Sequence, residues 1–135
     1  SGKIEADLER LTRIAEVLRR AGGDWRVTLD GNETFSDAAS LGRFWQALQA
    51  SPALTDLLQR TLLLEQPLAR AVALRESIAS LGIGVPVILD ESDDHAEALD
   101  EGLALGVGRE IRAPAVGEPR DHQARACVMC SVRLW

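Results

Sequence analysis

The chain has 135 residues, which is the size of one ordinary domain, and 46% of them are hydrophobic, enough for a core. Its net charge is −6 and it contains no basic block, which excludes the counterion displacement that non-specific nucleic-acid binding needs. No apolar run approaches the roughly 18 residues of a membrane span, and no segment reads as a signal peptide. We therefore expect a cytoplasmic protein with neither nucleic-acid nor membrane partners.

The first half of the chain is predicted to alternate between helices and strands. Apolar residues at helical spacing predict a helix over 4–21, and Trp25 to Leu29 is rich in strand-forming residues. Ser36-Asp37 can cap a second helix, and Pro52 stands in the first turn of a short third one. Each of these segments has its own start or stop signal.

The same alternation continues in the second half. Thr61 to Leu64 reads as a short strand, 69–81 as a helix, Pro86 to Leu89 as the next strand, and Ser92 or Asp93 caps a helix running to about Leu105. Strands that alternate with helices are typical of a parallel sheet with right-handed crossovers. We therefore expect an α/β domain over residues 1–108.

Residues 109–135 have no clear period, and we expect an irregular tail there. Sequence that is not native to the domain, such as a shifted reading frame, is one explanation of this change. Val128 to Leu134 is the one strand candidate in the tail. Cys127 and Cys130 form a lone C-x-x-C, which suits a redox pair or half a zinc site with His122. Zinc needs four ligands, so two incidental reduced thiols are the favoured interpretation.

An acidic motif stands at the end of each of three predicted strands. These motifs are Asp30-Gly31-Asn32, Glu65-Gln66-Pro67 and Asp90-Glu91-Ser92. Carboxyl ends of parallel strands lie on one face, and clustered carboxylate oxygens bind hard divalent cations such as Mg²⁺. Asp30 could instead form a turn and Asp90 could cap a helix, whereas Glu65 has no capping role. We expect Asp30, Glu65 and Asp90 to converge on one metal ion.

At these motifs the chain resembles the enolase superfamily, in particular its mandelate racemase and muconate lactonizing branch. Members carry D-x-N, E-Q-P and D-E-S motifs on three successive barrel strands, and the resemblance covers roughly residues 3–107. It implies a barrel of the TIM type, with Asp30, Glu65 and Asp90 as Mg²⁺ ligands. Asn32 and Glu91 would lie behind the ligands or face a small carboxylate substrate. The implied chemistry removes the proton α to that carboxylate and stabilises the enediolate with the metal.

The acid–base residues of that family have no counterpart here. A K-x-K pair is expected on the strand before Asp30, but Lys3 is the only lysine and is predicted to begin a helix. No lysine lies beyond residue 108, and His122 lacks a strand context. We therefore expect a partial barrel of about three parallel strands with flanking helices, part of a racemase, dehydratase or cycloisomerase and inactive alone. Open sheet edges predict completion by missing segments or by a homo-oligomer.

Two other classes of protein remain open. One is a non-catalytic α/β metal-binding module that assembles with copies of itself. The other is a flavodoxin-like or receiver-type domain that binds Mg²⁺ for phosphotransfer. Such domains gather acids near the first strand and use a lysine on a late strand, whereas this chain spreads its acids over three strands and has no late lysine.

Overall fold

The chain folds around a sheet of four parallel strands in the order β3-β2-β1-β4. The computed structural model describes residues 2–89, 98–107 and 128–134. The strands are β1 (Trp25–Asp30), β2 (Thr61–Glu65), β3 (Val87–Ile88) and β4 (Val128–Arg133). The expected α/β class with a parallel sheet is confirmed, and the sheet has one strand more than the three expected.

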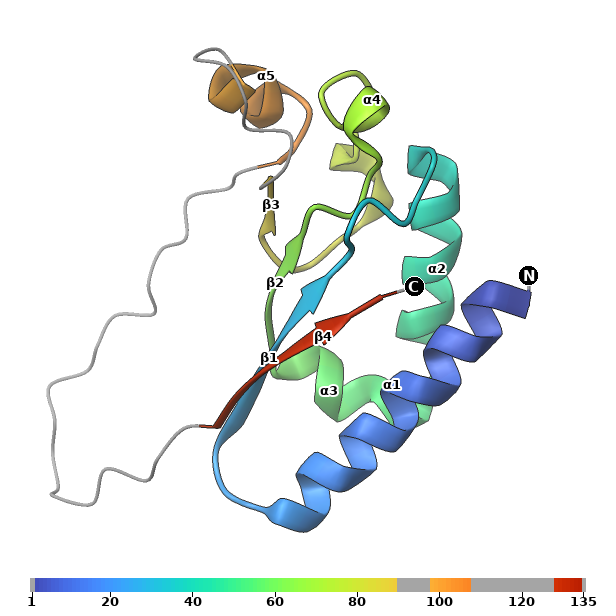
Figure 1. Cartoon of the computed structure of the whole chain (residues 1–135), viewed down its shortest axis with the longest axis vertical. Helices are drawn as coiled ribbons and strands as arrows, with labels where there is room; N and C mark the ends of the chain where they lie inside the picture. The colour runs from blue at the N-terminus through green and yellow to red at the C-terminus, as the bar shows by residue number, and fades with distance from the viewer. Residues whose placement is uncertain (1, 90–97, 108–127, 135) are drawn as a thin grey trace, which may run out of the picture.

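Helices α1, α2 and α3 lie on one face of this sheet, and α4 and α5 lie near the carboxyl ends of the strands (Figure 1). The helical segments are α1 (Gly2–Ala21), α2 (Ala38–Ala50), η1 (Pro52–Leu54), α3 (Thr55–Gln59), α4 (Arg70–Ala73), η2 (Ala79–Leu81) and α5 (Ala98–Ala104). None of the helices in the described part of the chain is long and apolar enough to cross a bilayer.

The core forms because β1 alternates between buried and half-buried positions. Trp25, Val27 and Leu29 are buried, and they belong to one apolar cluster with Phe44 and Trp45 of α2. Burial of each such side chain contributes about 1.5–3 kcal/mol. The alternate positions of β1 place its polar side chains on the other face of the sheet, and Asp30 is the last of them.

Most predicted elements are confirmed, with shifted ends. Asp37 caps α2 as expected, because its carboxylate accepts a 2.6 Å hydrogen bond from the Ser40 backbone N–H. The predicted short helix at Pro52 appears as η1 followed by α3. The predicted strand from Pro86 to Leu89 is shorter, at Val87–Ile88.

The continuous helix predicted over 69–81 is wrong. Only α4 and η2 are helical there, with a turn between them. Two long-range contacts replace the missing helical turn. The Ile78 N–H donates to the Leu105 carbonyl at 3.0 Å, and Glu76 accepts a 2.6 Å hydrogen bond from the Ala38 N–H at the start of α2. Tertiary partners therefore override the local helical period.

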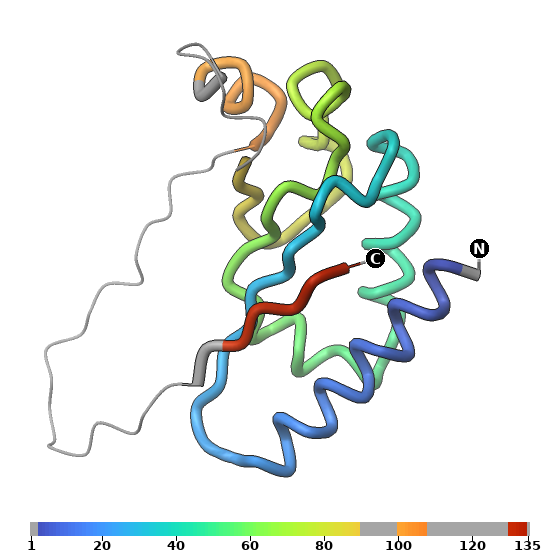
Figure 2. Tube along the Cα trace, viewed as in Figure 1, coloured from blue at the N-terminus to red at the C-terminus, as the bar shows by residue number. Residues whose placement is uncertain are grey.

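The strand candidate in the tail is confirmed as β4, which lies beside β1 although about a hundred residues separate them (Figure 2). The register pairs Asp30 with Arg133. Val132 and Leu134 are buried, and the Leu134 N–H donates to the Asp30 carbonyl at 2.7 Å. Residues 128–134 therefore belong to the sheet through both backbone pairing and core packing.

Candidate metal site at the carboxyl ends of the strands

Asp30 and Glu65 stand directly opposite each other where β1 and β2 end. They are register partners in the parallel pair, and the Gly31 N–H donates to the Glu65 carbonyl at 2.7 Å. Register partners point to the same face of a sheet, and neighbouring strands lie about 4.8 Å apart. Two of the three predicted metal ligands are therefore brought together by backbone pairing.

The third predicted ligand, Asp90, and its neighbour Glu91 lie outside the described residues. The described chain approaches them along β3, where Ile88 is the register partner of Glu65. Asp90 follows Ile88 by two positions in the sequence. Among the described residues no group of three His, Cys, Asp or Glu side chains could hold a metal ion. The convergence of all three carboxylates therefore stays a prediction.

Backbone strain is concentrated at this edge of the sheet. The described non-glycine residues with positive φ are Asn32 (43°), Glu33 (59°) and Gln66 (33°). All of them lie within three residues of the end of β1 or β2. Residues other than glycine rarely adopt positive φ. Such backbone strain persists only where the surrounding structure holds it, commonly at functional sites.

Gly31 allows the first two motifs to pack backbone against backbone. A Cβ atom at this position would lie 2.4 Å from the Pro67 Cα, a distance that no real contact permits. Beyond it, the Glu33 N–H donates to the Gln66 carbonyl at 2.9 Å, and the Phe35 N–H donates to the Pro67 carbonyl at 3.0 Å. The close approach of the two loops therefore requires glycine at position 31.

Arg133 was not predicted as a site residue, and it lies on β4 as the register partner of Asp30. Its Nε donates to Asp30 Oδ2 at 2.9 Å, and the Asn32 backbone N–H donates to Oδ1 at 2.9 Å. Only the strand candidate at Val128 to Leu134 pointed to this part of the tail. Each oxygen of an ionised carboxylate has two lone pairs, so Asp30 can still accept a cation. Carboxylate oxygen is the ligand type that Mg²⁺ prefers, and the guanidinium of Arg133 would lie beside an ion bound at Asp30.

Asn32 contacts Asp30 through its backbone N–H, and the predicted role of its side chain stays a prediction. Glu33 was not foreseen. Its carboxylate accepts hydrogen bonds from the Arg70 backbone N–H at 3.1 Å and from Arg70 Nη2 at 3.0 Å. These bonds lower the pKa of Glu33 below its ordinary value, the backbone bond most. Glu33 therefore links the loop after β1 to the start of α4 by hydrogen bonds.

Of the residues considered as alternative chemistry, the structure describes Lys3 and Cys130. Lys3 lies in the first turn of α1, as predicted, and it is exposed. Cys130 is half-buried on β4, whereas Cys127 and His122 lie outside the described residues.

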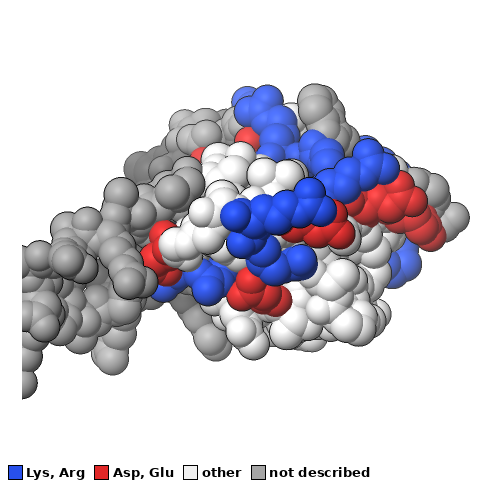
Figure 3. All heavy atoms as spheres, turned by 90° about the horizontal axis from the view of Figure 1, so that it is seen from below, with Lys and Arg blue, Asp and Glu red and all other residues white. Residues whose placement is uncertain are grey.

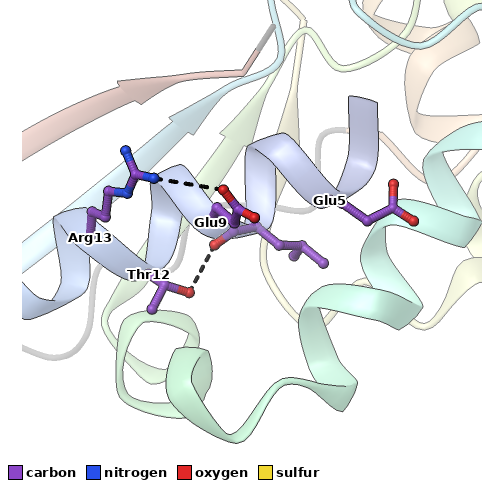
Figure 4. Close-up of a pocket in the computed structure, with 5 residues that line it drawn as sticks. Glu5, Glu9, Thr12 and Arg13 are labelled. Carbon is purple, nitrogen blue, oxygen red and sulfur yellow. Dashed lines mark hydrogen bonds and ion pairs between the residues drawn. The ribbon is translucent and has the colours of Figure 1, made fainter. Parts of the chain in front are cut away.

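A hollow along α1 is a separate feature (Figure 4). The described residues that line it are Glu5, Leu8, Glu9, Thr12 and Arg13. Arg13 is 3.6 Å from the Glu9 carboxylate, and the Thr12 hydroxyl donates to the Leu8 carbonyl at 2.8 Å. These polar groups bind one another within a single helix, so the hollow offers no convergent set of ligands.

Comparison of the chain with models of protein families, with curated proteins and with solved structures found no match.

Proposed function

We propose that Asp30, Glu65 and Asp90 bind Mg²⁺ and that the chain is a partial (β/α) barrel with the chemistry of the enolase superfamily. The observation that carries this proposal is the register pairing of Asp30 with Glu65 at the carboxyl ends of adjacent parallel strands. Ligands of parallel α/β sheets bind at that edge. The strained backbone that follows both strands is further support.

Bound Mg²⁺ would supply the positive charge that stabilises a carboxylate substrate as its α proton is removed. Asp30 and Glu65 would hold the ion together with Asp90, all three through carboxylate oxygens. Asn32 and Glu91 orient ligand or substrate. No lysine other than the exposed Lys3 exists to take the proton, so the chain binds metal without turning over substrate by itself.

Metal binding is tested by titrating the whole chain with MgCl₂ in a calorimeter. Asp30→Asn, Glu65→Gln and Asp90→Asn are each expected to weaken binding by about tenfold or more, because even groups behind the ligands are worth about 10–100-fold. Glu5→Gln is the matched control, since Glu5 is exposed on α1. If the three site variants bind Mg²⁺ as the wild-type chain does, the site is elsewhere.

Turnover is tested with a panel of acid sugars and muconates in the presence of Mg²⁺. We expect no product, because none of the strands in the described part of the chain carries a lysine or a histidine to act as the base. Robust turnover would show that the base is present after all.

The second candidate function is a non-catalytic metal-binding module that assembles with copies of itself. It is favoured by β4, a six-residue strand at the end of the sheet order, paired on one side with β1. Edge strands are templates for pairing with another chain. Light scattering during size-exclusion chromatography distinguishes this function, because a folded monomer at all concentrations contradicts it.

A further inference from the structure

We propose that the guanidinium of Arg133 anchors a carboxylate group of the ligand beside the metal site. This inference rests on the proposed function for its setting, and on the contacts of Arg133 for its chemistry. Arg133, Asp30 and Glu65 are register partners across β4, β1 and β2, so their side chains form one row on the same face of the sheet.

Within the described part of the chain, only one N–H group of the Arg133 guanidinium has a hydrogen-bond partner. This group is Nε, which donates to Asp30 Oδ2 at 2.9 Å. The Nη1–Nη2 end carries four further N–H donors, and 58% of the side chain is exposed. That end has the fork geometry that binds a carboxylate through two parallel hydrogen bonds.

The backbone that carries Arg133 is held in place on both sides. Val132 and Leu134 are buried in the core, and the Leu134 N–H bonds the Asp30 carbonyl at 2.7 Å. The Asp30 carboxylate holds the guanidinium through Nε, so the Nη1–Nη2 end stays available in the row that Arg133 shares with Asp30 and Glu65. A donor fork held ready in this way binds an anion with little loss of side-chain entropy.

A planar carboxylate is therefore the ligand class that fits this row. One carboxylate oxygen can reach a cation held by Asp30 and Glu65 while the group also accepts from Arg133. Without the cation, the two acids repel an anion, so we expect the metal and the anchor to act together.

The experiment titrates malonate into the whole chain with saturating MgCl₂ and, in a parallel arm, without it. Arg133→Met is expected to weaken malonate binding by about tenfold or more, in line with a hydrogen-bonded charge pair. Arg133→Lys keeps the charge but lacks the fork and should recover only part of the loss. Arg20→Met is the matched control, since Arg20 is exposed on α1.

A separate MgCl₂ titration of Arg133→Met distinguishes this inference from the proposed function. Mg²⁺ binding should be as tight as in the wild-type chain or tighter, because a positive charge next to Asp30 is removed. Wild-type malonate binding by Arg133→Met, full recovery by Arg133→Lys, or absence of malonate binding in both arms would overturn the anchor. Tighter binding of inorganic phosphate than of malonate would overturn the assignment to carboxylates. Failure of Mg²⁺ binding with a malonate site that still depends on Arg133 would overturn only the metal proposal.

Discussion

The two ends of the sheet arrange their charged side chains differently. At the amino end, Arg60 lies 3.6 Å from Asp24 and 2.9 Å from Asp56, and its guanidinium carbon is 4.6 Å from the centre of the Trp25 ring. Basic and acidic side chains lie next to one another when the molecule is viewed from below (Figure 3). At the carboxyl end, Asp30 and Glu65 are direct neighbours of like charge.

This difference is consistent with the proposed location of the metal site. Opposite charges that pair at a surface add modest stability and leave no net field. Like charges in register oppose folding unless a cation lies near, and here Arg133 is the neighbouring cation. The residues with positive φ lie at the same end, which is also the end of the proposed metal site.

The largest expected effect at the carboxyl end is that of Gly31→Ala. The new methyl group meets the Pro67 backbone, and overpacking of this kind costs about 1–3 kcal/mol. Gly84→Ala is the control, because nothing lies within 4 Å of a Cβ built there. Urea unfolding measures both, and equal free energies of unfolding for the two variants would contradict the close approach of the loops.

A smaller effect is expected at the amino end from Arg60→Met. The variant loses the contacts with Asp24 and Asp56 and the stacking on Trp25, which together contribute about 1 kcal/mol. Mg²⁺ binding should not change, since the two ends are separate. Arg43→Met, at an exposed position of α2, is the stability control. Weaker Mg²⁺ binding in Arg60→Met would break the division between the ends.

The smallest effect is expected from Glu33→Gln, and it depends on pH. Hydrogen bonds from Arg70 lower the pKa of Glu33 below its ordinary value of 4.5 in the folded chain. The stabilisation is therefore present above about pH 4.5, where the unfolded chain is also ionised, and it is lost as pH falls through the lower folded pKa. Thermal unfolding from pH 7 to pH 3 should show the melting temperatures of the wild-type chain and Glu33→Gln converging at low pH. A constant difference would exclude a role for the ionised carboxylate.

Local pattern predicted much of the fold for a physical reason. Strand periodicity in β1, helical periodicity in α1 and the Asp37 cap depend on neighbouring residues, and each is observed. The helix over 69–81 was wrong because its partners, Leu105 and Ala38, are distant in sequence.

The candidate site divides in the same way. Asp30 and Glu65 were predicted from their position after apolar strands, and the sheet brings them into register. Arg133 could not be predicted, because only the pairing of β4 with β1 places a residue about a hundred positions away beside Asp30.

By itself the sequence determined the alternation of strands and helices and the identity of the acids, whereas the need for a small residue at position 31 came from the close approach of Pro67. The tertiary structure alone decided the strand order, the addition of β4 and the guanidinium that faces the first acid. The physical reason is range: periodicity and capping act over a few residues, whereas sheet order is selected by burial and backbone pairing between distant segments.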